Sequence, residues 1–185
     1  MSDYIKKGKG KEQEQVKCVI NMEVYLIRHG IAGSRGTYAD DEQRPLVKKG
    51  QDKTAQVAQR LFQGGLKFDL ILTSPLVRAY QTAEILQQAG LTETFEVFAP
   101  LKPDGAIAEW LEWLQQYQLQ HPDDKIALVG HQPDLGNWTE MLLWGTIKGQ
   151  IEVKKAGVIG LKIPEIGTPI ARCTLFLHTA PKWLI

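Results

Sequence analysis

The chain has 185 residues, of which 43% are hydrophobic and 23% are charged, with 22 lysines and arginines against 21 acidic residues. A chain of this length can bury a sufficient core as one soluble globular domain, which excludes disordered, collagen-like and disulfide-stapled classes. The net charge of +1 creates no general field for nucleic acid or an anionic membrane, so any anion site must be a local cluster.

The cysteines and the apolar runs restrict the compartment and the cofactors. Cys18 and Cys173 are far apart in sequence and show no metal-ligand spacing, which predicts a reducing, cytoplasmic location without a bound metal or other cofactor. No apolar run approaches the roughly 18 residues of a membrane span, and no export signal is evident. The expected partners therefore exclude membranes and nucleic acids.

The N-terminal 21 residues differ from the rest of the chain. Residues 1–21 carry five lysines and three acidic residues with almost no apolar pattern, which indicates a disordered basic extension. Met22 is a candidate natural start, and we expect one domain over 22–185. From Glu23 onward, apolar runs of strand length alternate with segments of helical period. This alternation predicts an α/β fold, a three-layer αβα sandwich with a mostly parallel sheet.

The first half of the chain predicts two strands, each followed by a helix. The first strand, 24–27, is an unbroken apolar run typical of a strand buried on both faces, and Arg28-His29-Gly30 follows it directly. A loop rich in Gly, Ser and Asp leads to an amphipathic helix over 51–63. The second strand is 69–73. Ser74-Pro75 then predicts an N-cap and a first-position proline for a helix that ends near residue 89.

The second half repeats the pattern and ends with two more strands. A short strand over 95–98 precedes an amphipathic helix over 107–119. The fourth strand, 125–129, is closed by Gly130-His131, and Asp134 lies in the first turn of the helix that follows, where its charge complements the helix dipole. Two strands near 157–163 and 171–177 are expected to complete one edge of the sheet.

Basic residues follow three of the expected strands. Arg28 and His29 come after the first strand, Arg78 after the second and His131 after the fourth. In an open parallel sheet, ligands bind beyond the carboxyl ends of the strands, so we expect these four side chains to meet at one edge. Guanidinium groups offer forked hydrogen bonds that match phosphoryl oxygens. The expected ligand is therefore a phosphoryl group, bound without a metal.

Three motifs at these strand ends, in this order, resemble those of the histidine phosphatase superfamily. They are VYLIRHG at 24–30, SPLVRAYQTA at 74–83 and VGHQP at 129–133. The resemblance covers about residues 22–178 and implies a phosphoglycerate mutase-like fold. Within the superfamily, the small size, Arg44-Pro45-Leu46, the segment 100–105 and the segment 156–159 are similar to SixA-type phosphohistidine phosphatases.

The resemblance also implies roles for the basic residues. His29 would attack phosphorus and carry a phosphohistidine intermediate that water then hydrolyses. Arg28, Arg78 and His131 would bind the phosphoryl oxygens, and His131 would stabilise the charge that develops during transfer. The two arginines would also keep His29 neutral, because like charges lower a histidine pKa. Arg44 is a candidate substrate-binding residue at the pocket rim; the alternative is a solvated loop arginine.

The proton donor departs from the pattern of larger family members, whose glutamate-bearing motif is missing here. Only Asp104 and Glu109 lie nearby, and Asp104 is the candidate general acid, although the Pro103-Asp104-Gly105 turn alone explains an aspartate there. If the enzyme has no general acid, it would favour substrates whose leaving group needs little protonation. The leaving group of phosphohistidine departs more easily than that of an alkyl phosphate.

These observations favour one substrate class and leave two alternatives open. The favoured substrate is phosphohistidine on a protein, such as a histidine phosphotransfer domain in signal transduction. One alternative is a phosphatase for a small phosphorylated metabolite, which a nearby acid would favour. The other is a non-catalytic module that binds phosphate or a phosphoprotein without turning it over.

Overall fold

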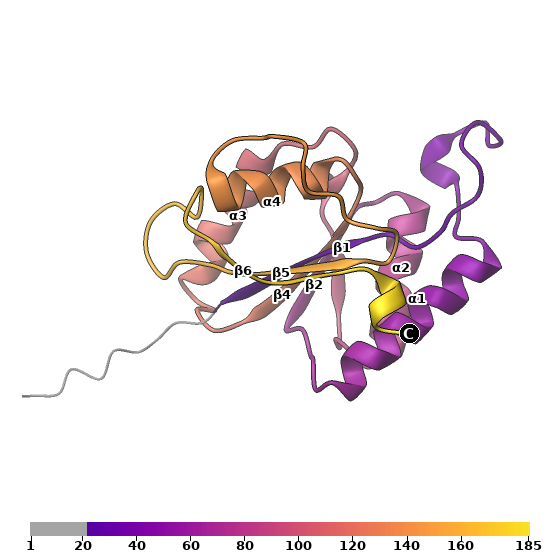
Figure 1. Cartoon of the computed structure of the whole chain (residues 1–185), viewed down its shortest axis with the longest axis horizontal. Coiled ribbons are helices and arrows are strands. Elements are labelled where there is room, and N and C mark those ends of the chain that lie inside the picture. Colours follow the sequence, from indigo (N-terminus) through magenta and orange to yellow (C-terminus); the bar gives the residue numbers. More distant parts are fainter. Residues whose placement is uncertain (1–21) are drawn as a thin grey trace, which may run out of the picture.

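The computed structural model describes residues 22–185, so the disordered extension expected over 1–21 lies outside the described residues. Six strands form one mixed sheet in the order β3-β2-β4-β1-β5-β6, and α-helices cover both of its faces (Figure 1). The three-layer αβα sandwich expected from the sequence is confirmed. Within residues 22–185, no helix has both the length and the apolar character needed to cross a membrane.

The order of the elements follows the predicted alternation. The strands are β1 (Glu23–Arg28), β2 (Leu70–Thr73), β3 (Phe95–Val97), β4 (Lys125–Gly130), β5 (Val158–Lys162) and β6 (Thr174–Thr179). The helices are α1 (Lys48–Gln63), α2 (Val77–Gln88), α3 (Ile107–Gln118) and α4 (Asp134–Trp144). Strands β1 to β4 pair in parallel, whereas β5 and β6 are antiparallel to their neighbours.

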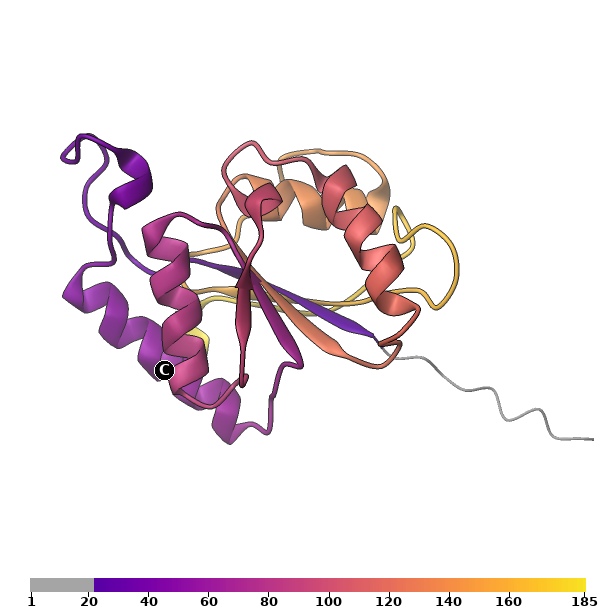
Figure 2. The same ribbon diagram turned by 180° about the vertical axis from the view of Figure 1, so that it is seen from behind.

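The unbroken apolar run of strand β1 is buried on both faces of the sheet. Val24 and Leu26 pack in the core on one side of the sheet, with residues of α3 and α4. Tyr25 and Ile27 point to the opposite side and pack with residues of α1 and α2. Figure 2 shows these two pairs of helices on opposite faces of the sheet. Because each large apolar side chain contributes roughly 1.5–3 kcal/mol when fully buried, this strand needs apolar residues on both faces.

Several element boundaries differ from the prediction. Helix α1 begins at Lys48 rather than near residue 51. Helix α2 begins at Val77, and its N-cap residue Leu76 is capped by no side chain, so the prediction of Ser74 as the N-cap is wrong. The Ser74 hydroxyl instead accepts from the backbone N–H of Leu76 at 3.3 Å. Strand β6 begins at Thr174 rather than near residue 171, because the N–H groups of Arg172 and Cys173 both donate to the Leu142 carbonyl in α4.

The topology places three parallel strand ends next to one another. Strand β4 lies between β1 and β2, with Arg28 opposite Gly130 and Thr73 opposite Val129. The residues that follow these strands therefore leave the sheet at the same edge.

Candidate active site

The shared edge brings together the four basic side chains that the sequence singled out. The backbone N–H of His29 donates to the Gly130 carbonyl at 3.1 Å, which fixes the ends of β1 and β4 side by side. The ring centroids of His29 and His131 are 5.2 Å apart, and Arg28 and Arg78 act electrostatically on both rings. His29, Arg78 and His131 are only 6%, 3% and 4% exposed, respectively.

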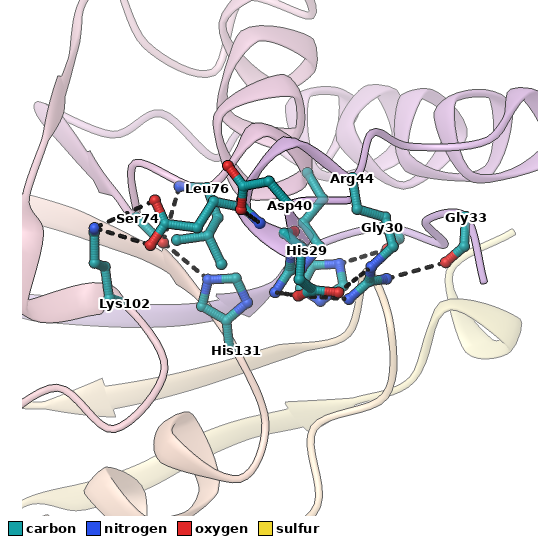
Figure 3. Close-up of polar contacts among 12 residues, drawn as sticks. His29, Gly30, Gly33, Asp40, Arg44, Ser74, Leu76, Lys102 and His131 are labelled. Carbon is teal, nitrogen blue, oxygen red and sulfur yellow. Dashed lines mark hydrogen bonds and ion pairs between the residues drawn. The ribbon is translucent and has the colours of Figure 1, made fainter. Parts of the chain in front are cut away.

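His29 is held with one ring nitrogen bonded and the other free. Its Nδ1 lies 2.7 Å from the carbonyl oxygen of Gly30, and a carbonyl can only accept, so Nδ1 carries the proton (Figure 3). Nε2 therefore holds a lone pair and receives no hydrogen bond from the described residues. Burial lowers the pKa of His29 well below its usual value, and His131 and the two arginines lower it further. The sequence predicts this shift from the arginines alone, whereas burial is its larger cause.

Gly30 permits the tight packing behind His29. A Cβ atom at this position would lie 2.4 Å from the Thr54 hydroxyl oxygen of α1, so any other residue would force Thr54 or the turn to shift. The Gly30 N–H donates to the Thr82 hydroxyl at 3.1 Å, and that hydroxyl donates to the Arg78 carbonyl at 2.8 Å. The turn that carries His29 is thus joined to the helix that carries Arg78.

His131 has the complementary arrangement. Its Nε2 lies 2.8 Å from the Ser74 hydroxyl, and its buried Nδ1 has no hydrogen-bond partner within residues 22–185 (Figure 3). Donation by the Ser74 hydroxyl to Nε2 would place the ring proton on Nδ1, where it can donate to a ligand oxygen. Burial, followed by the charges of Arg78 and Arg28, lowers the pKa of His131 to about 3, so the ring is neutral.

Both arginines keep a free donor at the site. Arg28 Nη1 donates to the Val153 carbonyl at 2.8 Å, and Arg78 Nη1 donates to the Asp41 carbonyl at 2.8 Å. The Nε atoms of both arginines are buried, yet they donate to none of the described residues. A buried donor without an acceptor costs about 1–3 kcal/mol. With Nδ1 of His131, the two Nε atoms make the site suited to an anion with several oxygens.

Arg44 joins this cluster through Asp41, a residue that no sequence motif singles out. Asp41 accepts from Arg44 Nε at 2.8 Å and lies 3.2 Å from Arg78 Nη2, so its carboxylate bridges two guanidinium groups. The hydrogen bond from Arg44 is the main reason that the pKa of Asp41 is lowered. Arg44 is 8% exposed and also donates to the Gly33 carbonyl, which rules out a freely solvated loop arginine.

Among residues 22–185, Asp104 forms no hydrogen bond or ion pair with the four basic residues. Its side chain is exposed, and its φ of 63° fits the tight turn expected from Pro103-Asp104-Gly105. Its backbone N–H is 3.4 Å from a carboxylate oxygen of Asp134. Among the described residues, no hydrogen bond or ion pair joins the Asp104 carboxylate to His29 or His131. Asp134, at the start of α4, has a raised pKa, mainly because of burial.

Two further residues near the site were not predicted as site residues. Ser74 resembled a helix cap, and only the structure shows that its hydroxyl contacts His131. Lys155, in the loop before β5, belongs to no motif that the sequence singles out. Burial, followed by the charges of Arg28 and Arg44, lowers the pKa of Lys155, which places it near the cationic cluster.

Comparison with known proteins gives consistent results. Residues 24–110 match the family model of the histidine phosphatase superfamily (branch 1). An uncharacterized protein of Picosynechococcus sp. is 49% identical over 165 residues, which are 89% of this chain and 99% of that protein. The phosphohistidine phosphatase SixA of Escherichia coli (strain K12) is 33% identical over 116 residues, 62% of this chain and 70% of SixA.

Solved structures support the same fold. A structure of the protein histidine phosphatase SixA complexed with tungstate matches with a TM-score of 0.78 and 24% identity, covering 89% of this chain and 100% of the SixA chain. The expected phosphoglycerate mutase-like fold is therefore confirmed.

Proposed function

Because this chain belongs to the histidine phosphatase superfamily, we propose that it is a phosphatase in which His29 forms a phosphohistidine intermediate. The observation that carries the proposal is the hydrogen bond from Nδ1 of His29 to the Gly30 carbonyl. This bond leaves the lone pair on Nε2, and the lowered pKa keeps that nitrogen unprotonated at neutral pH. A neutral imidazole with a free lone pair is the form that can attack phosphorus.

The reaction proceeds in two steps. Nε2 of His29 attacks phosphorus, a P–N bond forms, and the bond from phosphorus to the leaving group breaks. Water then attacks the phosphohistidine, releases inorganic phosphate and returns the free imidazole. Arg28, Arg78 and His131 bind the equatorial oxygens through their free nitrogens, and each charge-assisted hydrogen bond contributes roughly 1.5–3 kcal/mol.

Neither carboxylate near the site is suited to protonate a leaving group. This favours a substrate whose leaving group needs little protonation. Asp41 touches the cationic cluster, but its lowered pKa makes it a poor acid. Asp104 is exposed and contacts Asp134 through its backbone. A phosphoramidate expels its nitrogen leaving group more easily than an alkyl phosphate expels an alkoxide. We therefore propose phosphohistidine on a protein as the substrate, for example on a cytoplasmic histidine phosphotransfer domain.

A substrate panel tests this choice. We would measure kcat/KM for a phosphohistidine peptide, the matching phosphoserine peptide and a small sugar phosphate. Because a general acid typically contributes about 10²–10⁴-fold, the two esters should react more slowly than the phosphoramidate by about that factor. Equal or faster hydrolysis of the sugar phosphate would favour a metabolite phosphatase instead. Loss of all turnover in His29→Ala would show that the measured activity belongs to this site.

A further inference from the structure

The segment that joins α4 to β5, residues 145–157, runs from the C-terminal end of α4 to the start of β5; we call it the α4–β5 segment (Figure 1). Its buried residue Val153 provides the carbonyl that accepts from Arg28 Nη1 at 2.8 Å. Its residue Ala156 donates a backbone N–H to the Arg28 carbonyl at 3.0 Å. The α4–β5 segment therefore contacts both the side chain and the backbone of Arg28.

The opposite end of this segment is held by a buried carboxylate. Glu140 lies on α4 with 0% exposure, and within residues 22–185 no cationic side chain comes within ion-pair distance of it. Its partners are four successive backbone N–H groups, those of Lys148, Gly149, Gln150 and Ile151. The last three lie at 2.8, 2.5 and 2.7 Å. Burial alone would raise the pKa of Glu140, but these donors together lower it, so the carboxylate is ionised.

Gln132 adds a second connection at the middle of the segment. Its amide donates to the Ile151 carbonyl at 3.0 Å, and its carbonyl oxygen accepts from the Val153 N–H at 3.2 Å. Gly136 allows the close approach, since a Cβ atom there would lie 2.2 Å from the Ile151 carbonyl oxygen. The path from Glu140 to the Val153 carbonyl is thus short and hydrogen-bonded along its length.

From this path we propose that Glu140 is a positioning residue for Arg28. It anchors the α4–β5 segment so that the Val153 carbonyl fixes Nη1 of Arg28, while Nε stays free to bind a phosphoryl oxygen. The inference rests on the proposed function, because it takes Arg28 as a phosphate-binding group. A donor that is fixed before the ligand arrives binds it without reorganising, which strengthens both binding and transition-state stabilisation.

The test is a double-mutant cycle on phosphate affinity. Glu140→Gln keeps the size of the side chain, but its amide nitrogen cannot accept, so part of the row of N–H groups loses its acceptor. Calorimetric titration with inorganic phosphate should show about tenfold weaker binding in Glu140→Gln than in the wild type. In an Arg28→Ala background, the same substitution should change the affinity by less than about twofold, since the group it positions is gone.

Controls separate positioning from general loss of structure. Glu112→Gln, which removes an exposed carboxylate on α3, should leave phosphate affinity unchanged. If Glu140→Gln does not fold, Glu140→Asp takes its place; it keeps the buried charge and should bind phosphate with an affinity between those of the wild type and Arg28→Ala. With phosphoramidate, either folded variant should lower kcat as well as raise KM, because Arg28 contacts the transferring group.

The outcomes are distinct. A folded Glu140 variant with wild-type phosphate affinity, or with an equal loss in the Arg28→Ala background, would overturn the role of Glu140 alone. A wild-type protein that binds no phosphate would overturn the proposed function and this inference together. Calorimetry needs no turnover, so the two failures can be told apart.

Discussion

The imidazole rings of His29 and His131 face each other across 5.2 Å with their planes tilted by 53°. Two protonated imidazoles at this separation, beside two arginines, would repel strongly, and burial further disfavours the charged forms. Both rings are consequently neutral, and the positive charge of the site resides on the arginines. One neutral ring can then act as a nucleophile while the other donates a hydrogen bond.

The neutral histidines predict that stability falls in acid. The pKa of each of these histidines is lower in the folded protein than in the unfolded chain, where it is about 6.5. As the pH drops below about 6.5, the unfolded chain therefore binds a proton that the folded protein does not, and this favours unfolding. Between about pH 6.5 and the pKa of His131, about 3, this residue alone should lower the free energy of unfolding by about 1.4 kcal/mol per pH unit. Denaturant titrations across this range should show a shallower pH dependence for His131→Asn. Identical slopes would contradict a neutral His131.

Arg78→Lys should weaken phosphate binding although it preserves the charge. Lysine lacks the planar fork, so it cannot contact Asp41 through two nitrogens and also present a free Nε. Loss of one charge-assisted hydrogen bond, about 1.5–3 kcal/mol, corresponds to roughly a 10- to 150-fold higher inhibition constant for inorganic phosphate. Arg60→Lys, an exposed change on α1, is the matched control and should bind normally. Unchanged inhibition in Arg78→Lys would remove Arg78 from the phosphate site.

The fold could be predicted from the sequence because it is determined by the spacing of the apolar residues, which shows which positions are buried. The run 24–27 is apolar at every position since helices cover both faces of β1, and this pattern is visible without coordinates. The start of α2 could not be predicted, because Ser74 satisfies every local rule for an N-cap. Its hydroxyl contacts His131, 57 residues away in sequence, and no local rule registers that partner.

Part of the candidate site could likewise be predicted from the sequence, and part could not. Arg28 ends β1, His29 and His131 follow β1 and β4, and Arg78 lies in the first turn of the helix after β2. The topology of a parallel sheet was therefore enough to expect them together. Asp41, by contrast, lies in a short 3-10 helix between β1 and α1, and one of the two arginines that it bridges, Arg78, comes from a different element. Glu140 could not be predicted either, because its partners are backbone N–H groups, which every residue except proline carries.

Ser74→Ala should reduce catalysis modestly. Without the hydroxyl, Nε2 of His131 loses its partner, and the ring is no longer held with Nδ1 available to the phosphoryl group. A net hydrogen bond contributes about 0.5–1.5 kcal/mol, so kcat/KM with phosphoramidate should fall roughly 2- to 10-fold. Ser34→Ala, in the exposed loop before α1, should have no effect. A Ser74→Ala enzyme as active as the wild type would show that the contact does not orient His131.

Asp104→Asn should change turnover of phosphoramidate by less than about twofold. The side chain is exposed and held in a turn, and asparagine also tolerates its positive φ. Steady-state kinetics with phosphoramidate and with a phosphoserine peptide would check this expectation. A selective loss of about a hundredfold or more with the ester would instead identify Asp104 as the general acid.

Trapping the covalent intermediate tests the central claim most directly. Rapid quench during turnover of radiolabelled phosphoramidate should place the label on His29, in a form that is stable in alkali and labile in acid, and the label should disappear as substrate is exhausted. The His29→Ala protein should bind inorganic phosphate yet acquire no label. Turnover by the wild type without any protein-bound label, or equal labelling of His29→Ala, would contradict the account.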